Sequence, residues 1–255
     1  MKKLIIIIAA ILLSVSLFAK EYESPMSIYK DNYIVSGDSE TDQVTLQFSA
    51  KFNIFYPFDS GAYFGYTQKS WWKIYDSSSP FYETNYMPEA FIQFESGRNM
   101  FGNAVIPGVD YVKASPIFHK SNGRDEADNR SLNLYYGEIQ VSTGDIINIG
   151  ASGKVFGYYN KAKENYDINK YNKNYEANVF LKLRSKNVQY LDKEEFNVRF
   201  AGNPTGNGWY EVGFKFRILT TYVQPKLFFQ FRNGYDEFMI NYNEKHKSFR
   251  AGLVF

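Results

Sequence analysis

Apolar and polar residues alternate with a period of two along most of the chain. Between Val44 and Tyr56 the even-numbered positions are all apolar or aromatic, whereas the odd-numbered positions from Thr45 to Asn53 are all polar. The same alternation recurs over 175–184, 210–218 and 249–255. Successive side chains of a β-strand point to opposite faces, so this pattern predicts strands with one apolar and one polar face.

These runs predict an all-β protein, a transmembrane antiparallel β-barrel of the outer-membrane type with about 12 strands. A barrel over 44–255 would follow an N-terminal segment, 20–43, that lies on or inside it. The terminal Phe255 is also typical of bacterial outer-membrane barrels. The expected strands cover 44–57, 61–75, 87–97, 104–118, 131–143, 146–159, 174–186, 195–203, 208–219, 223–232, 237–245 and 247–255.

Composition favours the same interpretation. The chain has 22 Tyr, 23 Phe and 3 Trp, yet its mean hydropathy is only −0.41. A barrel with aromatic girdles and a polar interior combines these two properties. Lys and Arg share the polar faces with Glu, which predicts an interior plugged by side chains. A soluble β-sandwich, whose strands also alternate, is the alternative fold.

The first nineteen residues indicate a secretory signal peptide, 1–19. Lys2 and Lys3 precede an apolar run from Leu4 to Leu13, and Ala19 offers a small residue for cleavage. An N-terminal membrane helix is the alternative, but the run is shorter than the roughly 20 residues that a span needs. We therefore expect the protein in the bacterial outer membrane.

Charge and cysteine content exclude several kinds of site. The chain contains no Cys, so disulfides and thiolate sites are excluded. Its formal net charge is +2, and removal of Lys2 and Lys3 brings it close to zero. We therefore expect no nucleic-acid partner.

Candidate chemistry is concentrated in the middle of the chain. His119 and Ser121 are two residues apart, and Asn133 begins the next strand-like run. On a strand the first two would share one face, and a short hairpin would return Asn133 to the histidine. A histidine can take the proton of a neighbouring serine hydroxyl if a third group holds the imidazole. These residues predict a hydrolase site.

Three blocks carry a resemblance to a known family. They are Tyr66–Trp72, Ser77–Tyr86 and His119–Asn133. In order and spacing they resemble the outer membrane phospholipase A family of Gram-negative bacteria. The segment His-x-Ser-Asn-Gly-Arg, followed nine residues later by Asn133, is the most specific part. The resemblance implies a calcium-dependent phospholipase A1/A2 with lysophospholipase activity, which is active as a homodimer and at rest as a monomer.

The resemblance also implies roles for individual residues. Ser121 would be the nucleophile, His119 the general base, and Asn133 the residue that orients the imidazole. Gly123 would let its backbone N–H approach the oxyanion that forms on the substrate.

A Ca²⁺ cofactor is implied in the same way. Its ligands would be the backbone carbonyl of Arg124, the side-chain oxygen of Asn129 and a carbonyl of the other subunit from Ser78. Asn129 stands where the family commonly has serine, although an amide also offers an oxygen. The acidic residues of this loop, Asp125, Glu126 and Asp128, are either additional ligands or a solvated surface.

Gln68 is the expected polar contact between the two subunits. An amide that faces lipid must find a partner, because an unsatisfied polar group is costly there. The alternative is that Gln68 faces the barrel interior.

Two other functional classes remain open. A small porin or structural barrel would show the same alternation, but it would not need the His-x-Ser-Asn-Gly-Arg segment. An outer-membrane protease would need clusters of Asp and His at the rim, and the sequence offers no such cluster.

Overall fold

The computed structural model describes residues 25–37, 43–55, 61–95, 108–184, 192–217 and 225–255. The predicted signal peptide, 1–19, lies outside these residues. The strands are β1 (Met26–Ile28), β2 (Tyr33–Gly37), β3 (Val44–Phe55), β4 (Gly61–Trp72), β5 (Phe81–Glu95), β6 (Tyr111–Ser121), β7 (Ser131–Thr143), β8 (Ile147–Lys161), β9 (Tyr175–Arg184), β10 (Asp192–Gly202), β11 (Gly208–Arg217), β12 (Lys226–Gly234) and β13 (His246–Val254). Short 3₁₀ helices, η1 (Glu126–Asp128), η2 (Lys163–Asn165) and η3 (Ile168–Lys170), stand in the links. In the described part of the chain, no helix has the length and apolar character needed to cross a membrane.

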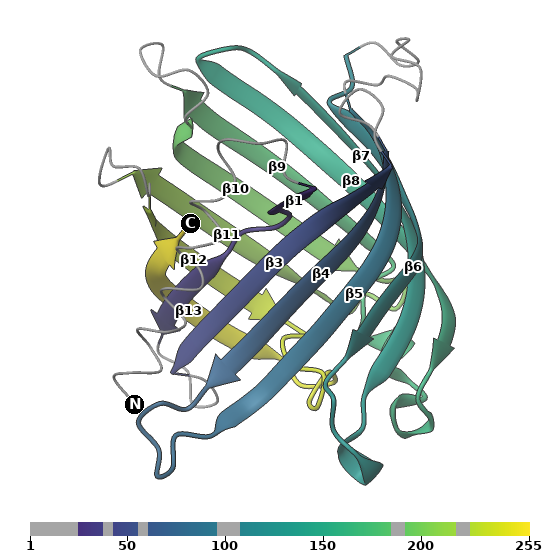
Figure 1. Ribbon diagram of the computed structural model, residues 1–255. Helices are drawn as coiled ribbons and strands as arrows, with labels where there is room; N and C mark the ends of the chain where they lie inside the picture. The colour runs from purple at the N-terminus through teal and green to yellow at the C-terminus, as the bar shows by residue number, and fades with distance from the viewer. Residues whose placement is uncertain (1–24, 38–42, 56–60, 96–107, 185–191, 218–224) are drawn as a thin grey trace.

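The strands close into one antiparallel barrel. Each strand from β3 to β12 pairs with the strand that follows it in the chain, β13 pairs with β2, and β2 pairs with β3. β1 and β2 both pair with β3, one after the other along its length. They therefore count as one interrupted strand of the wall. The circumference is therefore twelve strands (Figure 1). This confirms the predicted barrel, since a β-sandwich would have two separate sheets.

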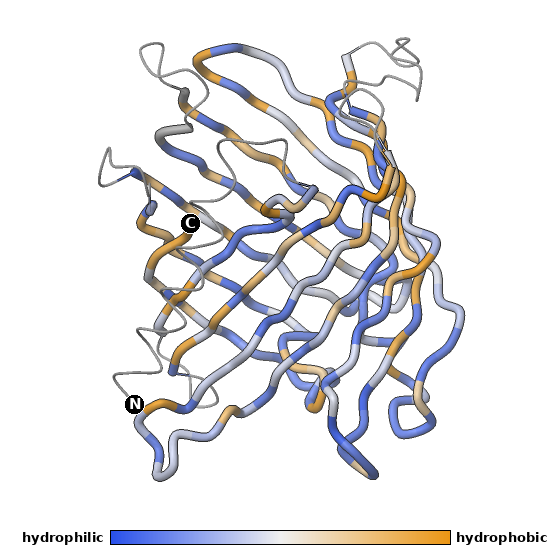
Figure 2. The backbone as a smooth tube through the Cα atoms, viewed as in Figure 1, coloured by the Kyte–Doolittle hydropathy of each residue, from blue (hydrophilic) through white to orange (hydrophobic). Residues whose placement is uncertain are grey.

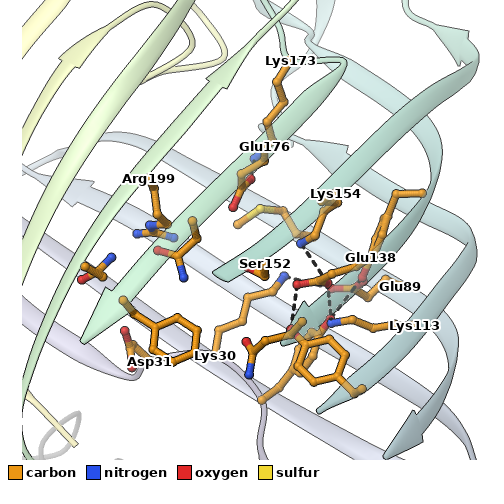
Figure 3. A pocket seen from close by; sticks show the side chains of 18 of the residues that line it. Lys30, Asp31, Glu89, Lys113, Glu138, Ser152, Lys154, Lys173, Glu176 and Arg199 are labelled. Atoms are coloured by element: carbon orange, nitrogen blue, oxygen red, sulfur yellow. Dashed lines mark hydrogen bonds and ion pairs between the residues drawn. The ribbon is translucent and has the colours of Figure 1, made fainter. Parts of the chain in front are cut away.

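Hydrophilic and hydrophobic residues alternate along the strands (Figure 2), and because successive side chains of a strand point to opposite faces, this alternation separates an apolar outer wall from a charged interior. Outward residues such as Phe64, Val155 and Phe196 are exposed, 43–67%. Inside, Glu138 lies 2.9 Å from Lys113 Nζ and 3.3 Å from Lys154 Nζ. Breaking such a buried pair typically costs about 3–5 kcal/mol. The pairs line a cavity of about 490 Å³ inside the barrel (Figure 3).

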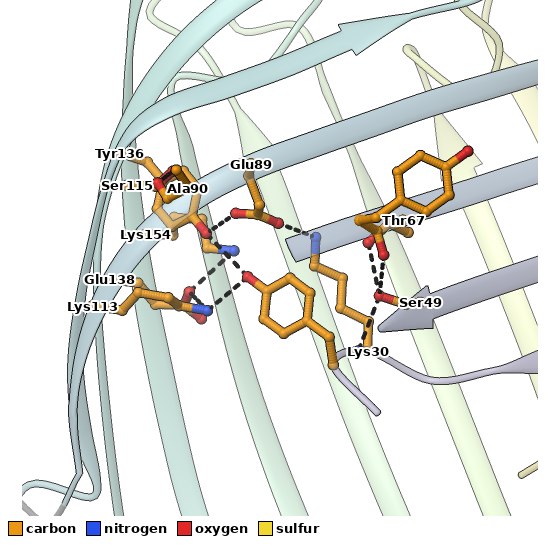
Figure 4. A network of polar contacts seen from close by, with 12 residues as sticks. Lys30, Ser49, Thr67, Glu89, Ala90, Lys113, Ser115, Tyr136, Glu138 and Lys154 are labelled. Carbon is orange, nitrogen blue, oxygen red and sulfur yellow. Dashed lines mark hydrogen bonds and ion pairs between the residues drawn. The ribbon is translucent and has the colours of Figure 1, made fainter. Parts of the chain in front are cut away.

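The wall begins before Val44. β2 closes the barrel from within the predicted N-terminal segment, 20–43. In the interruption between β1 and β2 the chain turns its side chains inward. Lys30 Nζ bonds Glu89 at 2.9 Å (Figure 4), and Tyr29 stacks on Phe91 with 5.0 Å between ring centroids. Part of that segment is therefore wall and part is interior.

The predicted strand over 237–245 is wrong. These residues form a link that folds into the mouth of the barrel, where Phe238 and Met239 are 1% and 0% exposed. The carboxylate of Glu83 on β5 accepts the backbone N–H groups of Met239 and Ile240, at 2.6 and 2.7 Å. In a strand these N–H groups would bond the backbone of a neighbouring strand, but here the Glu83 side chain accepts them instead. The apolar positions 238, 240 and 242 imitate strand alternation, which explains the error.

Because neighbouring strands are antiparallel, several links share one end of the barrel. They are 73–80, 122–130, 162–174, 203–207 and 235–245, at the lower end of the view in Figure 1. The candidate catalytic residues approach this end.

Candidate active site

A bulge in β6 decides which side of the wall carries the candidate nucleophile. Lys113 and Ser115 are buried in the interior, 6% and 1% exposed. At Pro116–Ile117, β6 has one residue more than either β5 or β7. Proline lacks the N–H that a regular ladder would need, so it suits this position. The extra residue reverses the alternation, and Ile117 emerges on the outside, 62% exposed.

After the bulge, His119 and Ser121 point outward. Lys120, between them, points inward and pairs with Asp236 at 3.0 Å. Without the extra residue the inward series from Lys113 and Ser115 would have continued to His119 and Ser121. The bulge therefore places both candidate residues on the lipid-facing wall.

The hairpin of β6 and β7 brings His119 to Asn133. The two residues are paired across the strands, and His119 Nδ1 lies 2.9 Å from Asn133 Oδ1. When Nδ1–H donates to this oxygen, Nε2 is left as the basic nitrogen of the ring. Leu132 and Leu134, on either side of Asn133, are buried in the interior, so Asn133 shares the outer face with His119.

Ser121 is the last residue of β6 and lies opposite Tyr86 of β5 and Ser131 of β7. The next residue, Asn122, is 4% exposed and holds the link 122–130 together. Its Nδ2 donates to the Asp128 carbonyl at 2.8 Å, and its Oδ1 accepts the Arg130 N–H at 3.0 Å. The sequence motif contains Asn122, but only its burial and its bonds reveal this structural role.

Gly123 occupies a position that other residues fit poorly. Its φ is +63°, in the left-handed region, and a Cβ there would lie 2.7 Å from a ring carbon of Tyr86. Both the backbone conformation and the close approach therefore require glycine.

The oxyanion role that the resemblance implies for Gly123 predicts that Gly123→Ala lowers kcat by about 10²-fold, because the link would have to move away from Tyr86 and take its backbone N–H out of position. Fatty-acid release from phospholipid micelles measures this. Gly108→Ala is the matched control, since Gly108 has φ +78° and open space around its Cβ position. Equal losses in both variants would show that backbone strain alone, and not the position of the link, is responsible.

The candidate calcium ligands lie in two links. Arg124 and Asn129 belong to the link 122–130, and Ser78, with φ +65°, belongs to the link 73–80 at the same end. Ser78 lies in the link between β4 and β5, whereas Arg124 and Asn129 lie in the link between β6 and β7. The pairing of β6 with β7 therefore does not bring Ser78 close to Arg124 and Asn129. The Arg124 guanidinium bonds the Tyr82 carbonyl, which ties the link 122–130 to β5.

The acidic residues of the link 122–130 favour a solvated surface. Asp125, Glu126 and Asp128 are exposed, and Asp128 lies 3.4 Å from Arg124. Across the described residues, no group of three or more His, Cys, Asp or Glu side chains is arranged to hold a metal. A metal here would have to use carbonyl and amide oxygens. The Asn129 carbonyl already accepts a bond from Arg130 at 2.9 Å, so the side-chain oxygen is the better candidate.

Gln68 faces outward, so the interior alternative is wrong. Its neighbours Thr67 and Lys69 point inward, and Lys69 reaches Glu237 at 3.4 Å. Gln68 Oε1 accepts the Tyr66 hydroxyl at 2.9 Å, and its Nε2 donates to Ser70 Oγ at 3.3 Å. Across the sheet Gln68 pairs with Tyr86, which pairs with Ser121. One row on the outer wall thus joins the candidate dimer contact to the candidate nucleophile.

Comparison with known proteins gives a consistent result. The family model for phospholipase A1 matches residues 4–255. A phospholipase A1 of Salmonella typhimurium is 28% identical over 259 residues, which cover 92% of this chain and 83% of that protein. A phospholipase A1 of Escherichia coli K12 is 30% identical over 191 residues, which cover 74% of this chain and 60% of that protein.

Solved structures share the fold. The outer membrane phospholipase A of Escherichia coli superposes with a TM-score of 0.75 at 24% identity, covering 94% of this chain and 96% of that one. The Salmonella typhi outer membrane phospholipase, a dimer with bound calcium, gives 0.74 at 25% identity, covering 90% and 92%. The family model and the phospholipase A1 relatives, rather than the shared fold, favour an enzyme over a passive barrel. The chain belongs to the phospholipase A1 family, carboxylic ester hydrolases of the bacterial outer membrane.

Proposed function

We propose that this phospholipase hydrolyses acyl esters of phospholipids and lysophospholipids with Ser121, His119 and Asn133, that it requires Ca²⁺, and that dimerisation activates it. The observation that carries the catalytic part is the 2.9 Å bond between His119 Nδ1 and Asn133 Oδ1. It orients the imidazole on the outer face that also holds Ser121.

The chemistry follows from this arrangement. His119 Nε2 takes the proton of the Ser121 hydroxyl while Oγ attacks the ester carbonyl. The imidazolium then protonates the leaving alcohol oxygen, which releases a lysolipid and leaves an acyl-serine. In the second half a water gives a proton to Nε2 while its oxygen attacks the acyl carbon; the bond between this carbon and Oγ then breaks, the imidazolium returns the proton to Oγ, and the fatty acid departs. Asn133 holds the ring throughout, but as a neutral amide it stabilises the imidazolium less than a carboxylate would.

The location of the residues suits the substrate. The acyl ester of a phospholipid lies at the boundary between headgroups and hydrocarbon, and Ser121 lies at the end of β6 where the wall meets the link 122–130. Exposed Tyr86 and Tyr135, 38% and 46%, surround this part of the outer wall, as aromatic residues commonly do at the membrane interface. A lipid would thus reach the serine without leaving the membrane.

The Ca²⁺ requirement rests on the oxygen donors beside Ser121. The carbonyl of Arg124 and the side chain of Asn129 are of the kind that Ca²⁺ accepts. Bound there, Ca²⁺ would supply positive charge to the oxyanion, together with the backbone N–H of Gly123. Two protein ligands from one link are few for this ion, and the partner's Ser78 would complete the set. The related Salmonella typhi enzyme is a calcium-bound dimer, which supports this proposal.

Gln68 supports self-association. Its amide stands on the outer wall among apolar and aromatic side chains such as Phe48 and Tyr86, its partners across the sheet. Tyr66 and Ser70 each take one hydrogen bond of this amide, and an amide can form further bonds with a second chain, which favours contacts between lipid-facing surfaces. The activated form would join two such walls and complete two calcium sites.

We predict that substitutions of His119 and Asn133 lower kcat to different extents. His119→Ala should remove nearly all activity, whereas Asn133→Ala should keep at least about 1% of kcat, because nucleophile and base remain. Asn160→Ala is the matched control, since Asn160 pairs with Asn133 across β7 and β8 and is exposed. Fatty-acid release is the measurement. Wild-type activity in His119→Ala would refute the proposed base.

A further inference from the structure

The link 235–245, here called the mouth link, is firmly anchored inside the barrel. Glu237 lies 3.4 Å from Lys69 and 3.3 Å from Arg250, and it also bonds Arg232. Burial acts to raise the pKa of Glu237, but these three cations outweigh it and hold the pKa below its usual value. Together with the two backbone bonds to Glu83, they fix the mouth link to β4, β5, β12 and β13.

The mouth link also supports the inner side of the catalytic hairpin. Asp236 Oδ1 lies 3.0 Å from Lys120 Nζ, with the two side chains 4% and 14% exposed. Met239 and Tyr242 form one buried cluster with Leu132 and Leu134 of β7. Arg130, immediately before β7, lies over the ring of Tyr242, with its guanidinium carbon 5.9 Å from the ring centroid. Both strands of the hairpin are therefore held from inside by the same eleven-residue link.

These inward contacts are made by the immediate neighbours of the catalytic residues. Lys120 stands between His119 and Ser121, and Leu132 and Leu134 flank Asn133. In a strand, a residue fixed on one face fixes the peptide units that aim its neighbours toward the other face. The Lys120–Asp236 pair thus acts on the two side chains that must exchange a proton, although it lies on the opposite side of the wall.

We propose that Lys120 is a positioning residue for the esterase reaction, and that its ion pair with Asp236 of the mouth link sets the alignment of Ser121 with His119. This inference rests on the proposed function of those two residues. Asp236 is held with φ +57°, a conformation that few non-glycine residues adopt. The ion pair therefore joins the mouth link to β6, which carries His119 and Ser121. Through this contact the mouth link helps to align the two side chains.

The test compares kcat, KM and folding of four variants in detergent micelles with Ca²⁺ present. Lys120→Met removes the cation, and Asp236→Asn removes the anion while keeping a side chain that tolerates positive φ. Each should lower kcat by about tenfold with KM almost unchanged. The double variant should lose no more than either single variant, because both act on one contact. Lys215→Met is the control: Lys215 is buried at least as deeply as Lys120, pairs with Asp31 at 2.7 Å and Glu195 at 3.0 Å, and lies on β11.

Wild-type kcat in both folded single variants would overturn the inference, and so would an equal loss in Lys215→Met, which would indicate a general effect of interior charge. Additive losses in the double variant would also contradict it. If Lys120→Met fails to fold, Asp236→Asn tests the same contact. Ser121→Ala is assayed in parallel: activity there would refute the proposed function itself, whereas an inactive Ser121→Ala beside a fully active Lys120→Met would refute only the positioning role.

Discussion

Replacing Ser121 with alanine should lower ester hydrolysis by about 10⁴-fold or more while the barrel stays folded. The hydroxyl is the proposed attacking group, and it stands at the end of β6 on the outer wall, away from the charge pairs that fill the interior. Its removal should therefore lower the rate of hydrolysis without loosening the packing of the barrel. Fatty-acid release measures the loss of activity. The difference in gel mobility between heated and unheated samples shows whether the barrel is folded.

Ser131→Ala is the matched control for this experiment. Ser131 pairs with Ser121 across β6 and β7, so both substitutions remove one hydroxyl from the same row of the wall. We expect wild-type activity in Ser131→Ala. Substantial hydrolysis by folded Ser121→Ala would reject Ser121 as the nucleophile.

Removing calcium with a chelator should lower kcat by about 10²–10³-fold, the loss typical of an electrostatic partner of the oxyanion. Added Ca²⁺ should restore it. Asn129→Ala should raise the Ca²⁺ concentration needed for half-maximal activity, because it removes one of the two oxygen donors that the link 122–130 offers.

Asp125→Asn separates this ligand set from the acidic surface of the same link. Asp125 is exposed, and we expect its neutralisation to leave the Ca²⁺ requirement nearly unchanged. The reverse result, an unchanged requirement in Asn129→Ala and a raised one in Asp125→Asn, would assign the ion to the acidic residues. Full activity in chelator would remove calcium from the mechanism.

Alternation in the sequence predicts most of the barrel, because its physical cause, one face in lipid and one in a polar interior, is local to each strand. The pairing of His119 with Asn133 is predictable for a similar reason, since consecutive strands of such a barrel pair with one another and the link 122–130 lies between these two. The 2.9 Å bond between them is a consequence of that register.

Other features depend on contacts that alternation does not encode. The bulge at Pro116 reverses the faces of β6, and a strict period of two would have placed His119 inside. The mouth link resembles a strand in sequence, but the carboxylate of Glu83, far away in the chain, takes its backbone donors. β2 is too short to show a strong period and is recognisable mainly by its pairing with β13.

The roles of Ser78 and Gln68 depend on a second copy of the chain. Ser78 lies in a link separate from the other candidate ligands, and the outward amide of Gln68 is a contact only if another wall faces it. The sequence and the single chain indicate which residues a second copy would contact, and the proposed calcium site would be complete only in the proposed dimer.

The most direct test of the central claim is to treat the enzyme in micelles with a fluorophosphonate that reacts with activated serines, and to locate the adduct by peptide mass spectrometry. We expect one adduct, on Ser121, formed in step with the loss of activity and absent from His119→Ala. Complete inactivation with Ser121 unmodified, or with the adduct on a serine that faces the barrel interior, would contradict a catalytic serine on the lipid-facing wall.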